Sequence, residues 1–434
     1  MRIPTLERRQ TFIIAIGVIA IIFILIILGG KGTRPQPAHL EIWGVFDEPS
    51  IFQELIADYQ KKNKHITIEY KKKSFDDYEN ELIDAFASDR GPDIWMIQNT
   101  WLAKHKDKIK EMPAELLSFA NFRESFVDVV EKDLTEEEKI YGLPLYVDTL
   151  ALFYNKGLLN SAGISSPPET WEELVDDLDK LVKRNQFGEI ERAGVALGTA
   201  ENINRSTDIL ALLMLQNGTK MVSEDKKSAA FNQSILLEGG AYYPGEDALR
   251  FYTDFANPSK RTYTWNRQIS YSIDAFIESK VAMMFNYSHH IATIKERVPY
   301  LNFDVAPMPQ IEGREFDINY ANYWAFTVSK KSQLNVVTEA WKFILYLTQK
   351  ENANKYLEKA KKPTARRDLV EWQKDDLELG VFAKQSLTAQ SWYQVRPSAI
   401  ETILANAIKD VILGSATTKK AIQTAADQVS LLMQ

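Results

Sequence analysis

The sequence has no cysteine among its 434 residues. Disulfides, thiolate metal sites, a cysteine nucleophile and a lipid-modified N-terminal cysteine are therefore excluded. Clustered positive charge is also missing from most of the chain. The net charge is −7 and the first 38 residues contribute +4, which leaves −11 for the remainder. Because nucleic-acid binding needs clustered Lys and Arg for phosphate contacts, we expect no nucleic-acid partner.

Common catalytic and nucleotide-binding motifs are absent too. The chain contains no P-loop, no G-x-G-x-x-G, no H-E-x-x-H and no G-x-S-x-G, so we expect neither a cofactor nor an enzyme. His289 and His290 are adjacent, but neighbours on an extended chain point apart, and we expect no metal there. A carboxylate pair such as Asp47 and Asp148 leaves a membrane-tethered glycoside-cleaving enzyme as an alternative, since sequence does not give their separation.

One long hydrophobic run lies near the N-terminus. Phe12 to Leu28 holds 17 apolar residues, and the uncharged run around it is 20 residues long. At about 1.5 Å per residue, this length crosses roughly 30 Å of hydrocarbon. A cleaved signal peptide is the alternative, although no A-x-A-like site follows. Because Arg8 and Arg9 precede the run, we expect a cytoplasmic tail (1–10), an uncleaved signal anchor (11–30), a linker (31–38) and the remaining chain outside the cytoplasmic membrane.

The remaining 396 residues are too many for one ordinary core, so we expect two lobes. Their first part alternates strand and helix patterns, with strands at 39–45, 66–70 and 93–97 and helices at 50–62 and around 75–86. This order predicts an α/β fold with right-handed crossovers and a parallel sheet flanked by helices. Further elements expected are a helix at 171–182 with a Thr170–Glu173 capping box, strands at 281–285 and 325–328, a helix at 340–356, and helices in the last 40 or so residues.

Ligands of open parallel sheets lie beyond the carboxyl ends of the strands. Those positions hold aromatic rings, amides and a few carboxylates in this sequence. Rings stack against apolar C–H surfaces, and amides and carboxylates bind hydroxyls, which predicts a polyhydroxylated ligand such as a sugar. The side chains at these positions are Phe46, Asp47, Glu48, Ser74, Phe75, Gln98, Asn99, Thr100, Trp101, Asn286, Tyr287, Ser288, His289, His290, Tyr320, Asn322, Tyr323 and Trp324. For Asp47 and Glu48, which precede Pro49, helix capping is the alternative.

The segment IYGLPLYVDTLALFYNKGLL at Ile140 to Leu159, with PPETWEEL at Pro167, resembles a known family. It is similar to the carbohydrate-type family 1 extracellular solute-binding proteins of ABC transporters, the group that contains maltose-binding protein. Shorter pieces such as LEIWG at Leu40, RGPDIWMI at Arg90 and FDVAPMPQ at Phe303 occur in the family's order. The resemblance covers residues 39 to 434. It implies a two-lobe periplasmic-binding-protein fold of type II, with the ligand between the lobes.

The resemblance also implies lobe boundaries and partners. Three crossovers are expected, near 146–149, 306–309 and 362–364, so that lobe 1 spans 39–147 plus 308–362 and lobe 2 spans 148–307 plus 363–434. The implied protein is a monomeric, membrane-anchored binding subunit of an ABC importer, which delivers a sugar or oligosaccharide to permease subunits. A ligand-sensing subunit of a signalling complex and a clamp for a non-sugar solute are the alternatives.

The same resemblance selects ligand-binding residues. Residues 47–48 and 99–101 match the lobe 1 wall, and Asp148 matches a position that is often acidic and faces the ligand. Residues 287–289 match a lobe 2 loop where a stacking aromatic is common, and the segment before residue 325 is often Gly-rich in relatives. The expected ligand-binding residues are Asp47, Glu48, Asn99, Thr100, Trp101, Asp148, Trp265, Tyr287, Ser288, His289, Tyr323, Trp324 and Arg396.

Overall fold

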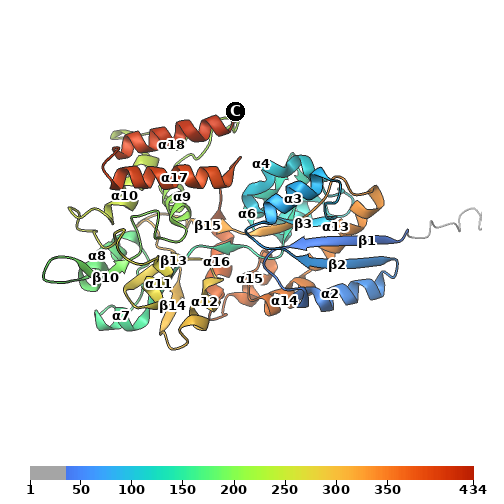
Figure 1. Cartoon of the computed structure of the whole chain (residues 1–434), viewed down its shortest axis with the longest axis horizontal. Helices are drawn as coiled ribbons and strands as arrows, with labels where there is room; N and C mark the ends of the chain where they lie inside the picture. The colour runs from blue at the N-terminus through green and yellow to red at the C-terminus, as the bar shows by residue number, and fades with distance from the viewer. Residues whose placement is uncertain (1–35) are drawn as a thin grey trace, which may run out of the picture.

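The computed structural model describes residues 36–434, so the tail and anchor expected at 1–30 lie outside the described residues. Within that range, none of the helices has the length and apolar character needed to cross a membrane. Figure 1 shows two lobes side by side along the long axis, with the first strand beginning far from the junction and running toward it. Each lobe has its own hydrophobic core. The two-lobe expectation is therefore confirmed.

Lobe 1 is built on a five-stranded sheet in the order β2-β1-β3-β16-β6. Its first three strands are parallel, as the alternating pattern predicts, whereas β16 runs antiparallel to both of its neighbours. Its elements are β1 (Ala38–Gly44), α2 (Pro49–Lys62), β2 (Ile66–Lys72), α3 (Tyr78–Ala87), β3 (Ile94–Gln98), α4 (Leu102–His105), α5 (Phe119–Ser125), α6 (Asp128–Leu134), β4 (Thr135–Glu136), β5 (Lys139–Ile140), β6 (Leu143–Pro144), β16 (Trp324–Val328), α13 (Leu334–Thr348) and α14 (Lys350–Ala360).

Two helix predictions in lobe 1 need correction. Phe75 precedes α3 and is 55% exposed, instead of lying on the buried face of that helix. The helix expected at 340–356 is two helices, because Gln349 has extended backbone (φ −59°, ψ 143°) and separates α13 from α14. The break lets both apolar faces, with Trp341 on one and Tyr356 on the other, reach the same core.

Lobe 2 has a mixed five-stranded sheet in the order β14-β8-β13-β10-β9. β8 is antiparallel to β13 and β14, while β10 is parallel to β13. Its elements are β8 (Ala151–Asn155), α7 (Lys156–Ser161), α8 (Trp171–Leu181), β9 (Lys183–Arg184), β10 (Ile190–Val195), α9 (Ser206–Gln216), β11 (Ile235–Leu237), β12 (Gly240–Tyr242), α10 (Pro244–Asp254), α11 (Ser272–Ile277), β13 (Val281–Asn286), α12 (His290–Arg297), β14 (Phe303–Ala306), α16 (Gly380–Gln385), α17 (Pro397–Ile412) and α18 (Thr418–Leu432). α17 packs between α9 and α18.

The start of α8 follows the capping prediction with one difference. Thr170 Oγ1 accepts a hydrogen bond from the Glu173 N–H (3.1 Å), which caps the helix. The Glu173 carboxylate accepts from the N–H of Glu169 (2.8 Å), one residue earlier than a capping box requires.

A small third sheet joins the lobes. Its order is β17-β15-β7, formed by β17 (Ala389–Gln390), β15 (Asn319–Asn322) and β7 (Asp148–Thr149). The chain changes core across β7 and again within β15, where Tyr320 packs in lobe 2 and Ala321 in lobe 1. Helix α15 (Arg367–Gln373) lies against α5 of lobe 1, and α16 follows in lobe 2.

The second and third crossovers lie later in the chain than the boundaries expected from sequence. The third falls not near 362–364 but between α15, whose Leu369 packs in the lobe 1 core, and α16, whose Phe382 packs in the lobe 2 core. Met308, Ile311 and Ile318 pack against the lobe 2 core, so the second crossover falls in β15 and not near 306–309. The Gln216 amide holds this segment by donating to the carbonyls of Pro309 (3.0 Å) and Ile318 (3.1 Å). Residues 308–318 have neither helical nor strand periodicity in their sequence. Their place in lobe 2 is therefore set by these non-local contacts.

Candidate ligand-binding cleft

A cleft of about 620 Å³ lies between the lobes and is lined by both lobes and by the joining sheet. This volume is typical of small-molecule sites. Eight of the thirteen predicted ligand-binding residues line it: Asn99, Thr100, Trp101, Asp148, Tyr287, Ser288, His289 and Trp324.

The lobe 1 wall is aromatic. Phe46, Phe75 and Trp324 pack against one another with ring centroids 5.5–6.2 Å apart. Trp101 lies 4.9 Å from Trp324 in an edge-to-face arrangement. Phe46 and Phe75 are 42% and 55% exposed, which is high for large apolar rings. These rings come from the carboxyl ends of β1 and β3 and from the segments beside them, so they offer ring faces to a ligand.

Neutral polar groups complete this wall. The Gln98 amide donates to Asn322 Oδ1 (3.1 Å), which links β3 to the joining sheet. Asn99 donates to Asp133 Oδ2 (2.9 Å), and Thr100 Oγ1 is buried without a hydrogen-bond partner among the described residues. Burial raises the pKa of Asp133 to about 6, although Ser391 and Asn99 oppose this by donating to its carboxylate. A buried hydroxyl without a partner costs stability unless a ligand or water satisfies it.

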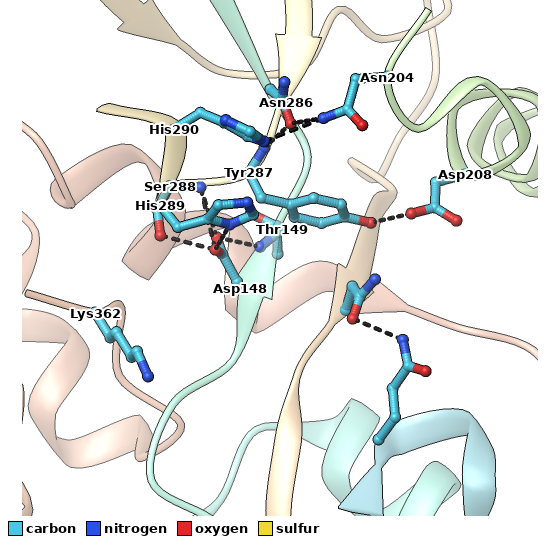
Figure 2. A network of polar contacts seen from close by, with 12 residues as sticks. Asp148, Thr149, Asn204, Asp208, Asn286, Tyr287, Ser288, His289, His290 and Lys362 are labelled. Carbon is cyan, nitrogen blue, oxygen red and sulfur yellow. Dashed lines mark hydrogen bonds and ion pairs between the residues drawn. The ribbon is translucent and has the colours of Figure 1, made fainter. Parts of the chain in front are cut away.

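Asp148 connects the joining sheet to lobe 2. Its carboxylate accepts from Ser288 Oγ (2.7 Å), from the Ser288 N–H (3.1 Å) and from the Thr149 N–H (2.9 Å), as Figure 2 shows. Burial raises the pKa of Asp148 to about 7 despite these donors. The carboxylate is therefore largely satisfied by its own protein, and it positions the loop that carries Ser288 and His289.

The two histidines after β13 do not point apart as expected, since their ring centroids lie 4.2 Å from each other, but their polar surroundings differ. His289 lines the cleft with 56% of its side chain exposed, and its Nδ1 lies 4.0 Å from Asp148 Oδ2. The pKa of His289 is lowered to about 4. The main cause is partial removal of water by the cleft walls, and the positive charges of Arg205 and Lys362 add to it. His290 Nε2 lies 3.1 Å from the Asn204 amide, away from Asp148 (Figure 2). Residues 36–434 contain no group of three His, Asp or Glu side chains that could hold a metal.

The lobe 2 wall carries charged groups that sequence reasoning missed. Arg205 and Asp208 come from the start of α9, and Glu401 from the first turns of α17. The Tyr287 hydroxyl donates to Asp208 Oδ2 (2.7 Å), and the Arg205 guanidinium lies 5.6 Å from the Tyr287 ring. Burial, reinforced by the Asp208 charge, raises the pKa of Glu401. These residues follow no strand, so the strand-end rule could not select them.

Five predicted residues do not line the cleft. The Asp47 carboxylate turns to Lys362 Nζ (2.7 Å) and the Tyr356 hydroxyl (2.8 Å), because a buried carboxylate needs a cation and donors. Glu48 is exposed and pairs with Lys72 (2.5 Å) without capping α2 through its side chain.

The other three have equally clear positions. Trp265 is fully buried and donates to Asn202 (3.1 Å). Tyr323, between β15 and β16, is fully buried too, and its hydroxyl donates to Asp133 (2.9 Å). Arg396 is an exposed residue that precedes α17.

Two proteins that are similar in sequence to this chain support the resemblance described above. A maltodextrin-binding protein of Bacillus subtilis is 26% identical over 319 residues, which cover 71% of this chain and 70% of that protein. A maltotriose-binding protein of Pyrococcus abyssi is 23% identical, over 72% of this chain and 62% of its own length.

Solved structures share the fold. The sugar-binding protein MalE from Xanthomonas citri superposes with a TM-score of 0.75 at 20% identity, over 91% of this chain and 97% of that one. A cyclo/maltodextrin-binding protein in complex with maltotetraose gives 0.75 at 19% identity, over 93% and 99%. The family model that describes bacterial extracellular solute-binding proteins matches residues 43–354 of this chain. The chain therefore belongs to the family of bacterial extracellular solute-binding proteins.

Proposed function

We propose that this protein is the sugar- or oligosaccharide-binding subunit of an ABC importer. The observation that carries the proposal is the interlobe cleft, in which exposed rings of lobe 1 face polar and charged groups of lobe 2. Rings stack on the apolar faces of sugars, while amides, carboxylates and guanidinium groups bind hydroxyls. Sugar-binding relatives support the same ligand class.

Binding is proposed to work by closure of the lobes. A ligand that contacts both walls gains contacts only when the lobes are close, so it shifts the population towards the closed form. The three-stranded joining sheet, with Asp148 in β7, is the element about which the lobes would move. The closed form would then deliver the ligand to permease subunits in the membrane.

The positions of Asp47 and Asp148 do not support glycoside cleavage by this pair. A glycosidase needs two carboxyl groups that face the same sugar. Asp47 is engaged by Lys362 and Tyr356 and does not line the cleft, and Asp148 is engaged by Ser288. The pair considered from sequence is therefore not assembled for that reaction.

We also propose that residues 11–30 anchor the protein in the cytoplasmic membrane, with a short tail inside and the lobes outside as a monomer. The uncharged run of 20 residues supports this part. Deletion of residues 1–30 should move the protein from the membrane fraction to the soluble fraction. Retention in the membrane after the deletion would contradict the anchor.

The test of ligand class is calorimetric titration of the purified full-length protein with maltotriose, galactotriose and cellotriose. We expect a dissociation constant of about 1 μM or tighter for at least one of them, which corresponds to about −8 kcal/mol. Amino acids, spermidine and a tripeptide serve as controls for non-sugar solutes. Binding of a control solute alone would contradict a sugar ligand.

A further inference from the structure

Arg205 and Glu401 face the cleft from neighbouring helices of lobe 2, α9 and α17. Among the described residues, neither the guanidinium of Arg205 nor the carboxylate of Glu401 has a hydrogen-bond or ion-pair partner. Their side chains are nevertheless electrically coupled, because each shifts the pKa of the other. A donor and an acceptor thus lie on one wall without bonding to each other.

The position of Arg205 is held by its surroundings. Its backbone has φ 61°, a left-handed conformation that non-glycine residues adopt only when the structure around them requires it. Its guanidinium lies 5.6 Å from the ring of Tyr287, whose hydroxyl is fixed by Asp208 at 2.7 Å. This cation–π contact engages none of the guanidinium N–H groups in a hydrogen bond, so they stay available for other partners.

Other charged groups of the cleft are already compensated. Lys362 pairs with Asp47 (2.7 Å), and Glu378 pairs with Lys295 (2.7 Å). His289 has its pKa lowered to about 4 and is neutral near pH 7. The lobe 2 wall near Arg205 therefore owes its charge to Arg205, Asp208 and Glu401, and Lys361, directly after α14, adds a cation to the cleft.

The chemistry of these groups distinguishes ligands by charge. A guanidinium only donates hydrogen bonds and a carboxylate only accepts them, whereas a hydroxyl does both and can satisfy the two together. A ligand carboxylate would pair with Arg205 but would face Asp208 and Glu401, and a ligand ammonium would pair with Glu401 but would face Arg205. Selectivity commonly comes from such repulsive contacts.

We infer that Arg205 and Glu401 are specificity-determining residues that together bind a hydroxyl of an uncharged saccharide and reject sugars with a carboxylate or ammonium at that position. The inference rests on the proposed function. It adds two residues and a charge selectivity that neither the strand-end rule nor the family resemblance predicts.

The test measures dissociation constants of the full-length protein for maltotriose, galactotriose and cellotriose, each also in a form oxidised to the carboxylate at C6 and a form aminated at C6. The variants are Glu401→Gln, which keeps the shape and one acceptor, and Arg205→Gln. The control is Glu224→Gln, since the Glu224 side chain is 97% exposed on the surface. Thermal unfolding of each variant checks that it folds.

For the wild type, we expect the charged forms of the bound trisaccharide to bind about a hundredfold more weakly than the neutral form. Glu401→Gln should reduce the discrimination against the carboxylate form by about tenfold, and Arg205→Gln should weaken neutral binding by about tenfold. Glu224→Gln should change neither value.

Two outcomes separate the inference from the proposed function. If a neutral trisaccharide binds but the charged forms bind equally well, or if Glu401→Gln and Arg205→Gln leave the discrimination unchanged, the inference is overturned and the sugar-binding proposal stands. If charged forms bind and neutral forms do not, the inference is also overturned. If no saccharide binds to the folded wild type, the proposed function itself is contradicted.

Discussion

The carboxylate of Asp148 is buried, and burial determines how it titrates although donors of its own protein surround it. Burial raises its pKa from 3.8 to about 7, even though Ser288 and Thr149 donate to it. Between about pH 4 and pH 7, the folded protein therefore holds a proton that the unfolded chain has released. A carboxyl with a raised pKa stabilises the fold at low pH, and this contribution is lost as the pH rises through 7.

We predict that Asp148→Asn removes this pH dependence. The free energy of unfolding of the wild type should fall relative to the variant by up to about 3 kcal/mol between pH 5 and pH 8. Urea unfolding of both proteins across that range measures the difference. Asp133, whose pKa is raised to about 6, titrates in both proteins and cancels. Parallel pH profiles would show that Asp148 titrates normally.

Phe75 tests the aromatic wall without disturbing the core. Its ring is 55% exposed and lies 6.2 Å from Trp324. Phe75→Ala should weaken saccharide binding by about fivefold, because a stacking ring contributes roughly 1 kcal/mol beyond its buried area. Calorimetric titration measures this change. Tyr300→Ala, which removes a 96% exposed ring that does not line the cleft, is the control, and equal affinities of the two variants would contradict a stacking wall.

At the scale of elements, helix α8 shows how local chemistry sets a boundary. Thr170 caps it through the Glu173 N–H, and its apolar residues Trp171, Leu174 and Leu178 are buried at helical spacing. The cap and the stripe are both local in sequence, so they could be predicted. The break at Gln349 between α13 and α14 could not, because both halves have helical periodicity and only their packing on lobe 1 separates them.

We predict that Thr170→Ala lowers the free energy of unfolding by about 1 kcal/mol, as loss of a helix N-cap does. Urea unfolding measures this loss. Saccharide affinity should not change, because Thr170 does not line the cleft. Thr170→Ser, which keeps the hydroxyl acceptor, is the matched control and should retain most of the stability. A weakened affinity in Thr170→Ala would mean that α8 affects the cleft.

At the scale of the whole molecule, the lobes are joined by strands of only two to four residues, β7, β15 and β17. The three strands come from distant segments of the chain. The chain passes from one core to the other at β7 and at β15, and β17 pairs with β15. Such a connection allows the lobes to rotate while each core stays packed.

We predict that saccharide binding brings the lobes closer. Because the chain has no cysteine, Asp107→Cys in lobe 1 and Gln434→Cys after α18 can be labelled specifically with a pair of dyes. Energy transfer between the dyes should rise when saccharide is added. A pair within lobe 1, Asp107→Cys with Glu137→Cys, should show no change. Binding without any rise for the first pair would contradict closure of the lobes.

The sequence by itself determined most strands and helices, the two-lobe fold and the aromatic and amide character of the cleft, because periodicity, capping and strand-end positions are local properties. Only the tertiary structure decided that Asp47 turns to Lys362 and that Arg205 and Glu401, almost 200 residues apart, line the same cleft. Side-chain direction near a cleft depends on which distant partner satisfies a buried charge. That partner is chosen by packing between segments and has no signature in the local pattern.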